Sequence, residues 1–309
     1  MATASGEEPR RLVPFLKWAG GKRWFVFGYE HLLPSSFGTY IEPFLGAGSV
    51  YFHLRPEKAI LGDANEDLIA AYQAIKSDWQ GLESSLRYRQ RRHNDDAEGY
   101  YYWLRDRRPE NLRQRASRLI YLNRTCFNGI YRVNRQGEFN VPRGTKDKVL
   151  IETDAFEAMS CLLQGAKLIA GDFELLVDRA KPGDFVFADP PYTVLHNYNG
   201  FLKYNEVLFS WADQQRLANA LLRAARRGVK VLCTNPPTER TSRRQVHLSE
   251  AADVGQTICH IGSTAQLMKE HAKHHFPRRT RIELVDVCLH QWNQTEVLRR
   301  VVRVGTPSL

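Results

Sequence analysis

Short apolar runs alternate with helical patterns along most of this 309-residue chain. Apolar runs of about four to eight residues bounded by glycine, proline or acids favour buried strands, whereas apolar positions three or four apart favour helices. On this basis strand segments are predicted at 39–44, 58–61, 166–173, within 184–192, and at 229–235. Helices are predicted at 49–54, 68–75 and 213–227, with Gly228 as the cap of the last. The succession of strand, glycine turn, helix and strand predicts an α/β fold built from βαβ units.

The middle of the chain breaks this alternation. Residues 86–118 are dense in arginine and aromatic residues and contain no clear strand pattern. Two short β-prone runs within 130–141 flank Arg135-Gln136-Gly137, which predicts a hairpin with glycine at its tip. We therefore expect a mainly helical insertion with a β-hairpin at 81–149, set into an α/β domain formed by 10–80 and 150–309.

The end of the chain is less regular. Two further strands are predicted around a turn at Asn293-Gln294, and the histidine-rich stretch 271–276 is predicted to be a loop.

Composition narrows the class of partner. Lysine and arginine number 44 against 34 acidic residues, a net charge of +10, which favours polyanionic partners. No apolar run approaches the roughly 20 residues of a membrane span. Five dispersed cysteines without a CxxC pair fit free thiols in a reducing compartment. A cytoplasmic protein without membrane contact is expected.

A glycine-rich turn follows the first strand, in Glu42-Pro-Phe-Leu-Gly-Ala-Gly-Ser49. Such a turn lets a ligand approach the backbone closely, and Asp63 lies 17 residues beyond Gly46, near the offset at which an acid binds ribose hydroxyls. Tyr51 replaces the third glycine of a dinucleotide site, and Arg23 follows Gly20-Gly21-Lys22 where a P-loop has Ser or Thr. The turn therefore favours an adenosine cofactor that carries a methionine tail in place of phosphates.

The sequence Asp189-Pro190-Pro191-Tyr192 ends another apolar strand. Two prolines cannot continue a central strand and hold their neighbours stiffly. The Asp189 carboxylate and the Pro190 carbonyl form a pair of acceptors for the two hydrogens of an exocyclic amine, while the Tyr192 ring can stack on a base. Accepting both hydrogens makes the amine nitrogen more nucleophilic. The motif predicts transfer of a methyl group to an amino-bearing nucleobase.

Such a pocket cannot reach a base inside a duplex, so the base has to be flipped out. The basic, aromatic-rich middle of the chain offers compensating contacts, and a two-stranded ribbon fits the major groove. An alternative for the arginines of 86–118 is a solvated helix face.

Four stretches together resemble the amino-directed DNA methyltransferases related to DNA adenine methyltransferase (Dam). They are Pro14–Lys22, Glu42–Val50, Leu122–Pro142 and Asp189–Tyr192, and their order is that of the alpha type. The resemblance implies a Rossmann-like fold that binds S-adenosylmethionine, with the insertion as the target-recognition domain. It also implies duplex DNA as substrate and adenine as the favoured base.

The resemblance further assigns residues. The implied catalytic residues are Asp189, Pro190 and Tyr192. The implied cofactor contacts are Trp18, Lys22, Phe44, Gly46, Gly48, Asp63, Asp172, Phe173 and Asp189, with Asp172 holding the cofactor's adenine beside Phe173. The implied DNA contacts are Lys17, Arg124, Phe127, Asn128, Ile130, Arg132, Asn134 and Pro142, with Phe127 inserting into the duplex. Residues 236–309 carry little that aligns with the family, and Pro236-Pro237 replace polar residues that the family usually carries.

Alternatives remain at this level. Amino-directed methylation of cytosine uses the same acceptor pair, and a catalytically silent DNA-binding regulator could share the fold. Methylation of RNA or of a protein glutamine is a third reading. A carbon-5 cytosine enzyme is disfavoured because no cysteine follows a proline. We expect a monomer without a metal, working alone or beside a cognate restriction endonuclease.

Overall fold

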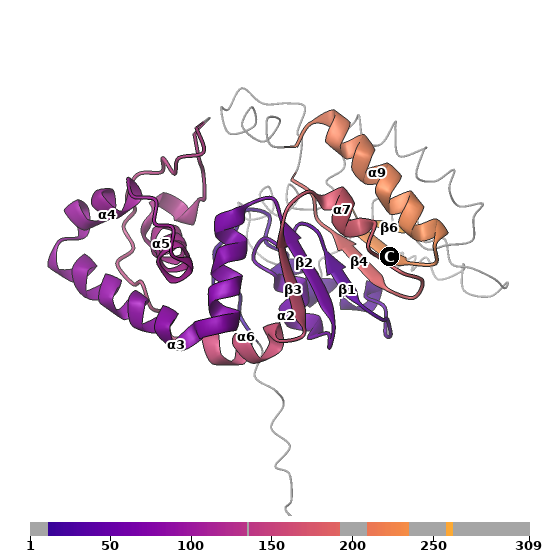
Figure 1. Ribbon diagram of the computed structural model, residues 1–309, viewed down its shortest axis with the longest axis horizontal. Helices are drawn as coiled ribbons and strands as arrows, with labels where there is room; N and C mark the ends of the chain where they lie inside the picture. The colour runs from indigo at the N-terminus through magenta and orange to yellow at the C-terminus, as the bar shows by residue number, and fades with distance from the viewer. Residues whose placement is uncertain (1–11, 135, 192–208, 235–257, 262–309) are drawn as a thin grey trace, which may run out of the picture.

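The computed structural model describes residues 12–134, 136–191, 209–234 and 258–261 (Figure 1). Predictions for Tyr192, the 271–276 loop and the strands around 293–294 lie outside the described residues. Strands in the described part are β1 (Tyr40–Glu42), β2 (Ala59–Asp63), β3 (Ala166–Ala170), β4 (Phe185–Ala188), β5 (Lys230–Thr234) and β6 (Ile258–Ile261). Helices there are α1 (Arg23–Gly28), α2 (Ser49–Leu54), α3 (Glu66–Asp95), α4 (Ala97–Arg105), α5 (Leu112–Thr125), α6 (Phe156–Leu163), α7 (Phe173–Val177) and α9 (Trp211–Arg226), with short 3₁₀ turns η1 (Glu30–Leu32) and η2 (Phe127–Gly129).

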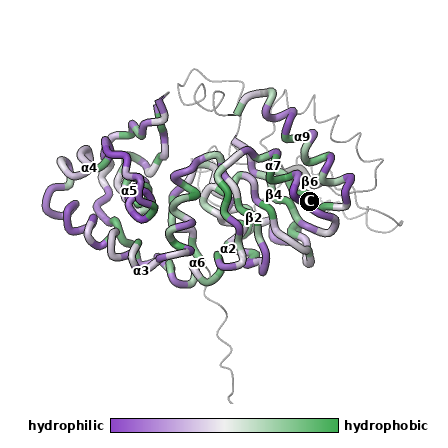
Figure 2. Tube along the Cα trace, in the orientation of Figure 1, coloured by the Kyte–Doolittle hydropathy of each residue, from purple (hydrophilic) through white to green (hydrophobic). Residues whose placement is uncertain are grey.

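The strands form one parallel sheet in the order β3-β2-β1-β4-β5-β6. Their side chains alternate between two cores, as the pleat requires. Tyr40 and Phe185 face one core, whereas Ile41 and Val186 face the other. The strands are mostly coloured as hydrophobic in Figure 2, as expected for strands covered on both faces. The predicted α/β, Rossmann-like fold is confirmed.

Helices cover both faces of this sheet. Apolar residues of α1, α2, α3 and α6 join the first core, and those of α7 and α9 join the second. The capping box between Ser210 and Asp213 starts α9, and Gly228, with φ of 89°, follows its end as predicted. The helices α1, α6 and α7 and the strand β6 were not predicted, because each is short, although the buried Phe156, Met159 and Leu163 of α6 do have helical spacing.

Helix α3 is much longer than the predicted helix at 68–75. Asn65 caps its first turn, and it continues to Asp95 through a kink at Asp78. The predicted domain boundary at 80/81 therefore falls inside α3. Beyond the kink, α3 leads away from the sheet to α4 and α5, which lie together at the left of Figure 1.

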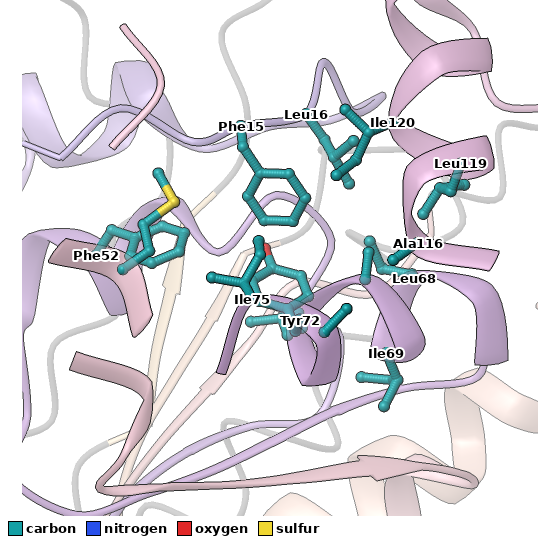
Figure 3. Packing of buried hydrophobic residues seen from close by; sticks show 14 of the residues in the cluster. Phe15, Leu16, Phe52, Leu68, Ile69, Tyr72, Ile75, Ala116, Leu119 and Ile120 are labelled. Carbon is teal, nitrogen blue, oxygen red and sulfur yellow. The ribbon is translucent and has the colours of Figure 1, made fainter. Parts of the chain in front are cut away.

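The apolar core continues from the sheet into this helical part. Figure 3 shows Tyr72 of α3 close to Phe15, and Leu68 of α3 on the side of Ala116 and Leu119 of α5. All four side chains are buried in one hydrophobic cluster that also contains Tyr40 and Phe185 of the sheet. We call α4, α5 and the part of α3 beyond Asp78 the helical lobe.

Between α5 and α6 lies the 126–144 loop, where the hairpin was predicted. The observed pairing is narrow, with one antiparallel bridge between Val133 and Phe139 and Gly137 at the tip with φ of 75°. Its base is closed by a bridge between Cys126 and Arg143. The turn is thus present without two regular strands.

The sheet order creates a topological switch point at one edge, and we use the word crevice for the region beyond the strand ends at this point. The chain proceeds from β1 to β2 and β3 on one side and then crosses to β4 on the other, so β1 and β4 are neighbours at a topological switch point. Ligands of such folds bind beyond the carboxyl ends of the strands at this point. Among the described residues, no helix is long and apolar enough to cross a bilayer.

Candidate active site

Asp189 follows directly after β4, at the switch point. Its Oδ2 accepts a hydrogen bond from Lys22 Nζ at 2.5 Å, and its Oδ1 accepts one from the Thr234 hydroxyl at 2.6 Å. The side chain of Lys22 is only 4% exposed and that of Asp189 is 16% exposed. Lys22 also donates to the carbonyl of Gly20 at 2.8 Å. The carboxylate is therefore held from two sides in a largely dry position, and the buried Pro190 follows it.

Thr234 was not predicted as a site residue. It ends β5, and the register that pairs Ala188 with Cys233 brings Thr234 beside Asp189. The signal in the sequence is a polar residue at the end of an apolar strand run, but it becomes informative only once β5 is known to neighbour β4.

A second buried acid lies under this site. Glu42 ends β1, is 3% exposed, and accepts a hydrogen bond from the Tyr40 hydroxyl at 2.8 Å. Burial raises the pKa of Glu42 well above its ordinary value, and the charges of Asp189 and Asp63 add to this, against the opposing effects of Tyr40 and Lys22. The buried Lys22 thus pairs directly with Asp189, and its charge also acts on Glu42.

The glycine turn after β1 is fixed by its neighbours. Gly46 has φ of 49°, its N–H donates to Asp63 Oδ2 at 3.1 Å, and its carbonyl accepts from the Tyr72 hydroxyl at 3.0 Å. A Cβ at Gly46 would lie 2.9 Å from Trp18 Cδ1, so the indole packs directly on the turn. Burial raises the pKa of Asp63, whereas hydrogen bonds from backbone N–H groups oppose that rise. Trp18, Gly46 and Asp63 are brought together at this turn, and Gly48, with φ of 66°, leads into α2.

Asp172, Phe173 and Phe44 form a neighbouring group. Asp172 caps α7 through the N–H of Glu174, and Arg216 of α9 donates to its Oδ1 at 2.8 Å. The ring of Phe44 stacks on that of Phe173 with centroids 5.3 Å apart. These residues lie at the carboxyl ends of β1 and β3, on the same sheet edge as Asp63 and Asp189.

The predicted DNA contacts divide into two groups. Phe127 is 53% exposed, Asn128 is exposed with φ of 55°, and the N–H of Phe127 donates to the carbonyl of the exposed Pro142 at 2.9 Å. Arg132 donates from Nε to Asn140 Oδ1 at 2.9 Å at the surface, and Ile130 is half-buried. Lys17 is exposed and its Nζ donates to the carbonyl of Asn128. These six residues lie together at the 126–144 loop.

The other two are used within the protein. The Arg124 guanidinium binds both oxygens of Asp154 at 2.6 and 2.7 Å and donates to the carbonyls of Phe15 and Val149. Its side chain is 7% exposed, which argues against a DNA contact. Asn134 accepts the N–H groups of Gln136 and Glu138 and so builds the turn itself. Sequence position alone could not separate these roles from those of their exposed neighbours.

Comparison with known proteins agrees with this arrangement. The family model for D12 class N6 adenine-specific DNA methyltransferases matches residues 18–261, more than half of the chain. The type II methyltransferase M1.LlaDCHI of Lactococcus lactis subsp. cremoris is 37% identical over 233 residues, covering 72% of this chain and 81% of that protein. The type II methyltransferase M.MjaIII of Methanocaldococcus jannaschii is 37% identical over 241 residues, covering 72% and 83%. A DNA adenine methylase of Serratia marcescens is 35% identical over 232 residues, covering 74% and 84%.

Proposed function

Because the chain belongs to the family of D12 class N6 adenine-specific DNA methyltransferases, we propose that its crevice binds S-adenosylmethionine and that Asp189 receives the amino group of a flipped-out adenine. Methylation of adenine in DNA, which requires a methyl donor, is the activity of this family and of this chain. We propose that the methyl donor is S-adenosylmethionine, that the target adenine is flipped out of the duplex, and that individual residues have the roles given below.

The observation that carries the proposal is the order of groups along the sheet edge. Asp172 and Phe173 follow β3, Asp63 ends β2, Gly46 follows β1 and Asp189 follows β4, and these strands are neighbours in that order. An adenosine laid across β3 and β2 would meet Asp172 with its amine and Asp63 with its ribose hydroxyls. Its methionine end would then point toward β4.

The residues present fit this cofactor. Gly46 adopts a left-handed conformation that keeps the turn free of a side chain, and Trp18 closes one side of it. The apolar rings of Phe44 and Phe173 lie beside Asp172, as a flat base requires. S-adenosylmethionine supplies a methyl group on a sulfonium, whose neutral thioether is a good leaving group.

Asp189 then has two tasks. Its carboxylate accepts a hydrogen of the adenine amine, the Pro190 carbonyl accepts the other, and the nitrogen lone pair is left to form the new N–C bond. The nitrogen gives up one proton afterwards, and Asp189 is the nearby acceptor. Lys22 and Thr234 hold the carboxylate in place before the substrate arrives, which lowers the cost of orientation.

For DNA we propose the segment 81–149 as the recognition region, with the 126–144 loop as its reading surface. Lys17, Phe127, Asn128, Ile130, Arg132 and Pro142 form the proposed contact surface. Phe127 is an exposed ring, as a residue that fills the space of a flipped base has to be. Arg124 and Asn134 are not part of this surface, because protein groups occupy their side chains.

Two of the relatives are named type II methyltransferases, which supports a cognate restriction endonuclease as partner in the cell. A monomer acting on duplex DNA in the cytoplasm completes the proposal.

The test is transfer of labelled methyl from S-adenosylmethionine to unmodified duplex DNA, followed by digestion to nucleosides. We expect the label in N6-methyl-2′-deoxyadenosine, and Asp189→Ala should reduce transfer by about 10²–10⁴-fold or more while the protein stays folded. Asp178→Ala, which removes an exposed carboxylate at the end of α7, is the matched control and should retain activity. Label in amino-methylated cytosine, or turnover by Asp189→Ala close to wild type, would contradict the proposal.

A further inference from the structure

Asn123, near the end of α5, joins two segments that are far apart in the sequence. It is 1% exposed, and its Oδ1 accepts the N–H of Lys17 at 2.9 Å. Its Nδ2 donates to the carbonyl of Lys17 at 2.8 Å and to the carbonyl of Gly129 at 3.2 Å. One buried amide thus fixes the backbone at Lys17 relative to the η2 turn.

One end of this connection leads to the cofactor crevice. Trp18, the residue after Lys17, packs on Gly46 of the glycine turn. The same segment continues to Gly20, whose carbonyl accepts from Lys22, and Lys22 binds Asp189. Residues 17–22 therefore touch both the glycine turn and the catalytic carboxylate.

The other end leads to the proposed DNA-reading surface. Gly129 closes the η2 turn that carries the exposed Phe127, and a Cβ at Gly129 would lie 2.7 Å from Lys17 Cδ. Tyr131, two residues further on, stacks on the Trp18 ring with centroids 5.2 Å apart. The amide of Asn123, the Trp18–Tyr131 stack and the hydrogen bond from Lys17 Nζ to the carbonyl of Asn128 are thus three links between the same two segments.

We propose that Asn123 is a positioning residue that couples engagement of the correct DNA sequence by the 126–144 loop to the geometry of the cofactor crevice. A displacement of the η2 turn moves Lys17 and Trp18 with it, because three hydrogen bonds and a close contact connect them. The inference rests on the proposed function, since it takes the 126–144 loop as the DNA-reading surface.

The coupling is measurable as a binding linkage. The dissociation constant of S-adenosylhomocysteine, the unreactive product, is measured without DNA and with a duplex carrying the sequence that the wild-type enzyme methylates. A third measurement uses the same duplex with one base pair of that sequence changed. For the wild type we expect correct DNA to tighten binding by roughly fivefold or more, and the altered duplex to do so much less.

The main variant is Asn123→Asp, which keeps the size and the acceptor but replaces the NH₂ group by an oxygen, so that at most one of the two donated hydrogen bonds can still form. Tyr131→Leu removes the ring stack on a half-buried loop residue and acts on the second link independently. Thr125→Val is the matched control, because Thr125 is equally buried on α5 and its hydroxyl bonds only to the local carbonyl of Tyr121.

In Asn123→Asp we expect the correct duplex to change the dissociation constant of S-adenosylhomocysteine by no more than about twofold. In Tyr131→Leu we expect the tightening by the correct duplex to be reduced as well. Thr125→Val should keep the wild-type effect even if its stability falls. Retention of the full effect in both Asn123→Asp and Tyr131→Leu would overturn the inference, as would a wild type that methylates adenine but shows no such effect. A wild type that methylates no DNA would instead refute the proposed function.

Discussion

The carboxyl edge of the sheet and the helical lobe use charged residues in different ways. At the sheet edge, Asp189 and Lys22 are largely buried and each is held by short hydrogen bonds before any substrate is present. In the lobe and its loop, Phe127 and Arg132 lie at the surface with few contacts. A preorganised carboxylate suits a reaction whose rate depends on orientation, whereas a surface that reads DNA has to remain accessible.

The arginines of the lobe sharpen this contrast. Arg89, Arg118 and Arg124 are buried and bind protein acceptors, such as Tyr100 for Arg89 and the Leu104 carbonyl for Arg118. These three are neither a DNA-binding patch nor a solvated helix face, whereas most arginines of 86–118, such as Arg87 and Arg91, are exposed, and for them both interpretations stay open. A run of arginines in a sequence therefore overstates the charge that is available to a polyanion.

The largest expected effect comes from breaking the buried pair at the sheet edge. Lys22→Met leaves Asp189 without its cation, and we expect the free energy of unfolding to fall by about 3–5 kcal/mol. Methyl transfer should fall by at least about 100-fold, because the carboxylate loses its position. Urea unfolding and the labelled-methyl assay check both. The double variant Lys22→Met/Asp189→Asn should regain stability without activity; equal instability of both proteins would contradict the pairing.

A comparable loss of stability, without a loss of DNA affinity, is expected in the lobe. Arg124→Met leaves Asp154 buried without a partner, so the free energy of unfolding should fall by about 3–5 kcal/mol. DNA binding is then measured by titration at a temperature at which the variant is folded. Because Arg124 makes no phosphate contact in this interpretation, we expect the DNA affinity of the variant to stay within about twofold of wild type. Loss of a phosphate contact would instead weaken DNA binding and lower its dependence on salt concentration. If DNA binding by Arg124→Met depended less on salt concentration than binding by the wild type, Arg124 would belong to the DNA interface after all.

The reading surface should show a smaller effect of a different kind. Arg132→Ala should weaken binding by about 1–3 kcal/mol or relax the choice of one base pair, with unchanged stability. Competition binding against duplexes with single altered positions measures this. The control is Arg87→Ala, an exposed arginine on α3. Unchanged discrimination at every position in Arg132→Ala would remove Arg132 from the reading surface.

The smallest effect concerns pH. Burial raises the pKa of Glu42, so between its unfolded and its raised folded value the folded chain binds more protons than the unfolded chain. The free energy of unfolding must therefore fall as pH rises through that window, by at most about 1.4 kcal/mol per pH unit. Glu42→Gln keeps an acceptor for Tyr40 and should lack this fall. Urea unfolding between pH 5 and 8 compares it with wild type and with the exposed control Glu57→Gln, and parallel curves for all three would show that Glu42 carries no such linkage.

The sequence predicted the parts of the fold whose local pattern is strong. The strands around Ile41, Leu61 and Val186 and the helix ending before Gly228 follow from apolar runs and caps. The length of α3 could not be predicted from local pattern. Its outer half is rich in charged residues, and its buried positions are revealed only by packing against α5.

For the candidate site, motifs with a chemical reason of their own led to Asp189 and Gly46, whereas Lys22 came from the family resemblance alone. Thr234 and Asn123 were missed as functional residues because their importance comes from neighbours more than forty residues away along the chain. Such pairings depend on strand order and on helix packing, which no local pattern contains.

Helix α3 runs through the predicted domain boundary. This limits the ways in which enzymes of this family can acquire a preference for a new DNA target sequence. A cassette exchanged at 80/81 would cut this helix two residues beyond Asp78 and replace part of a shared core. The 126–144 loop is instead closed at its base by short backbone bonds between Phe127 and Pro142 and between Gly144 and Thr125. It is the smaller unit for grafting, and a graft has to keep the buried Cys126, Phe139 and Val141, which belong to the core. Within this lineage, target preference is therefore expected to diversify through loop grafts and point changes more readily than through shuffling of the whole lobe.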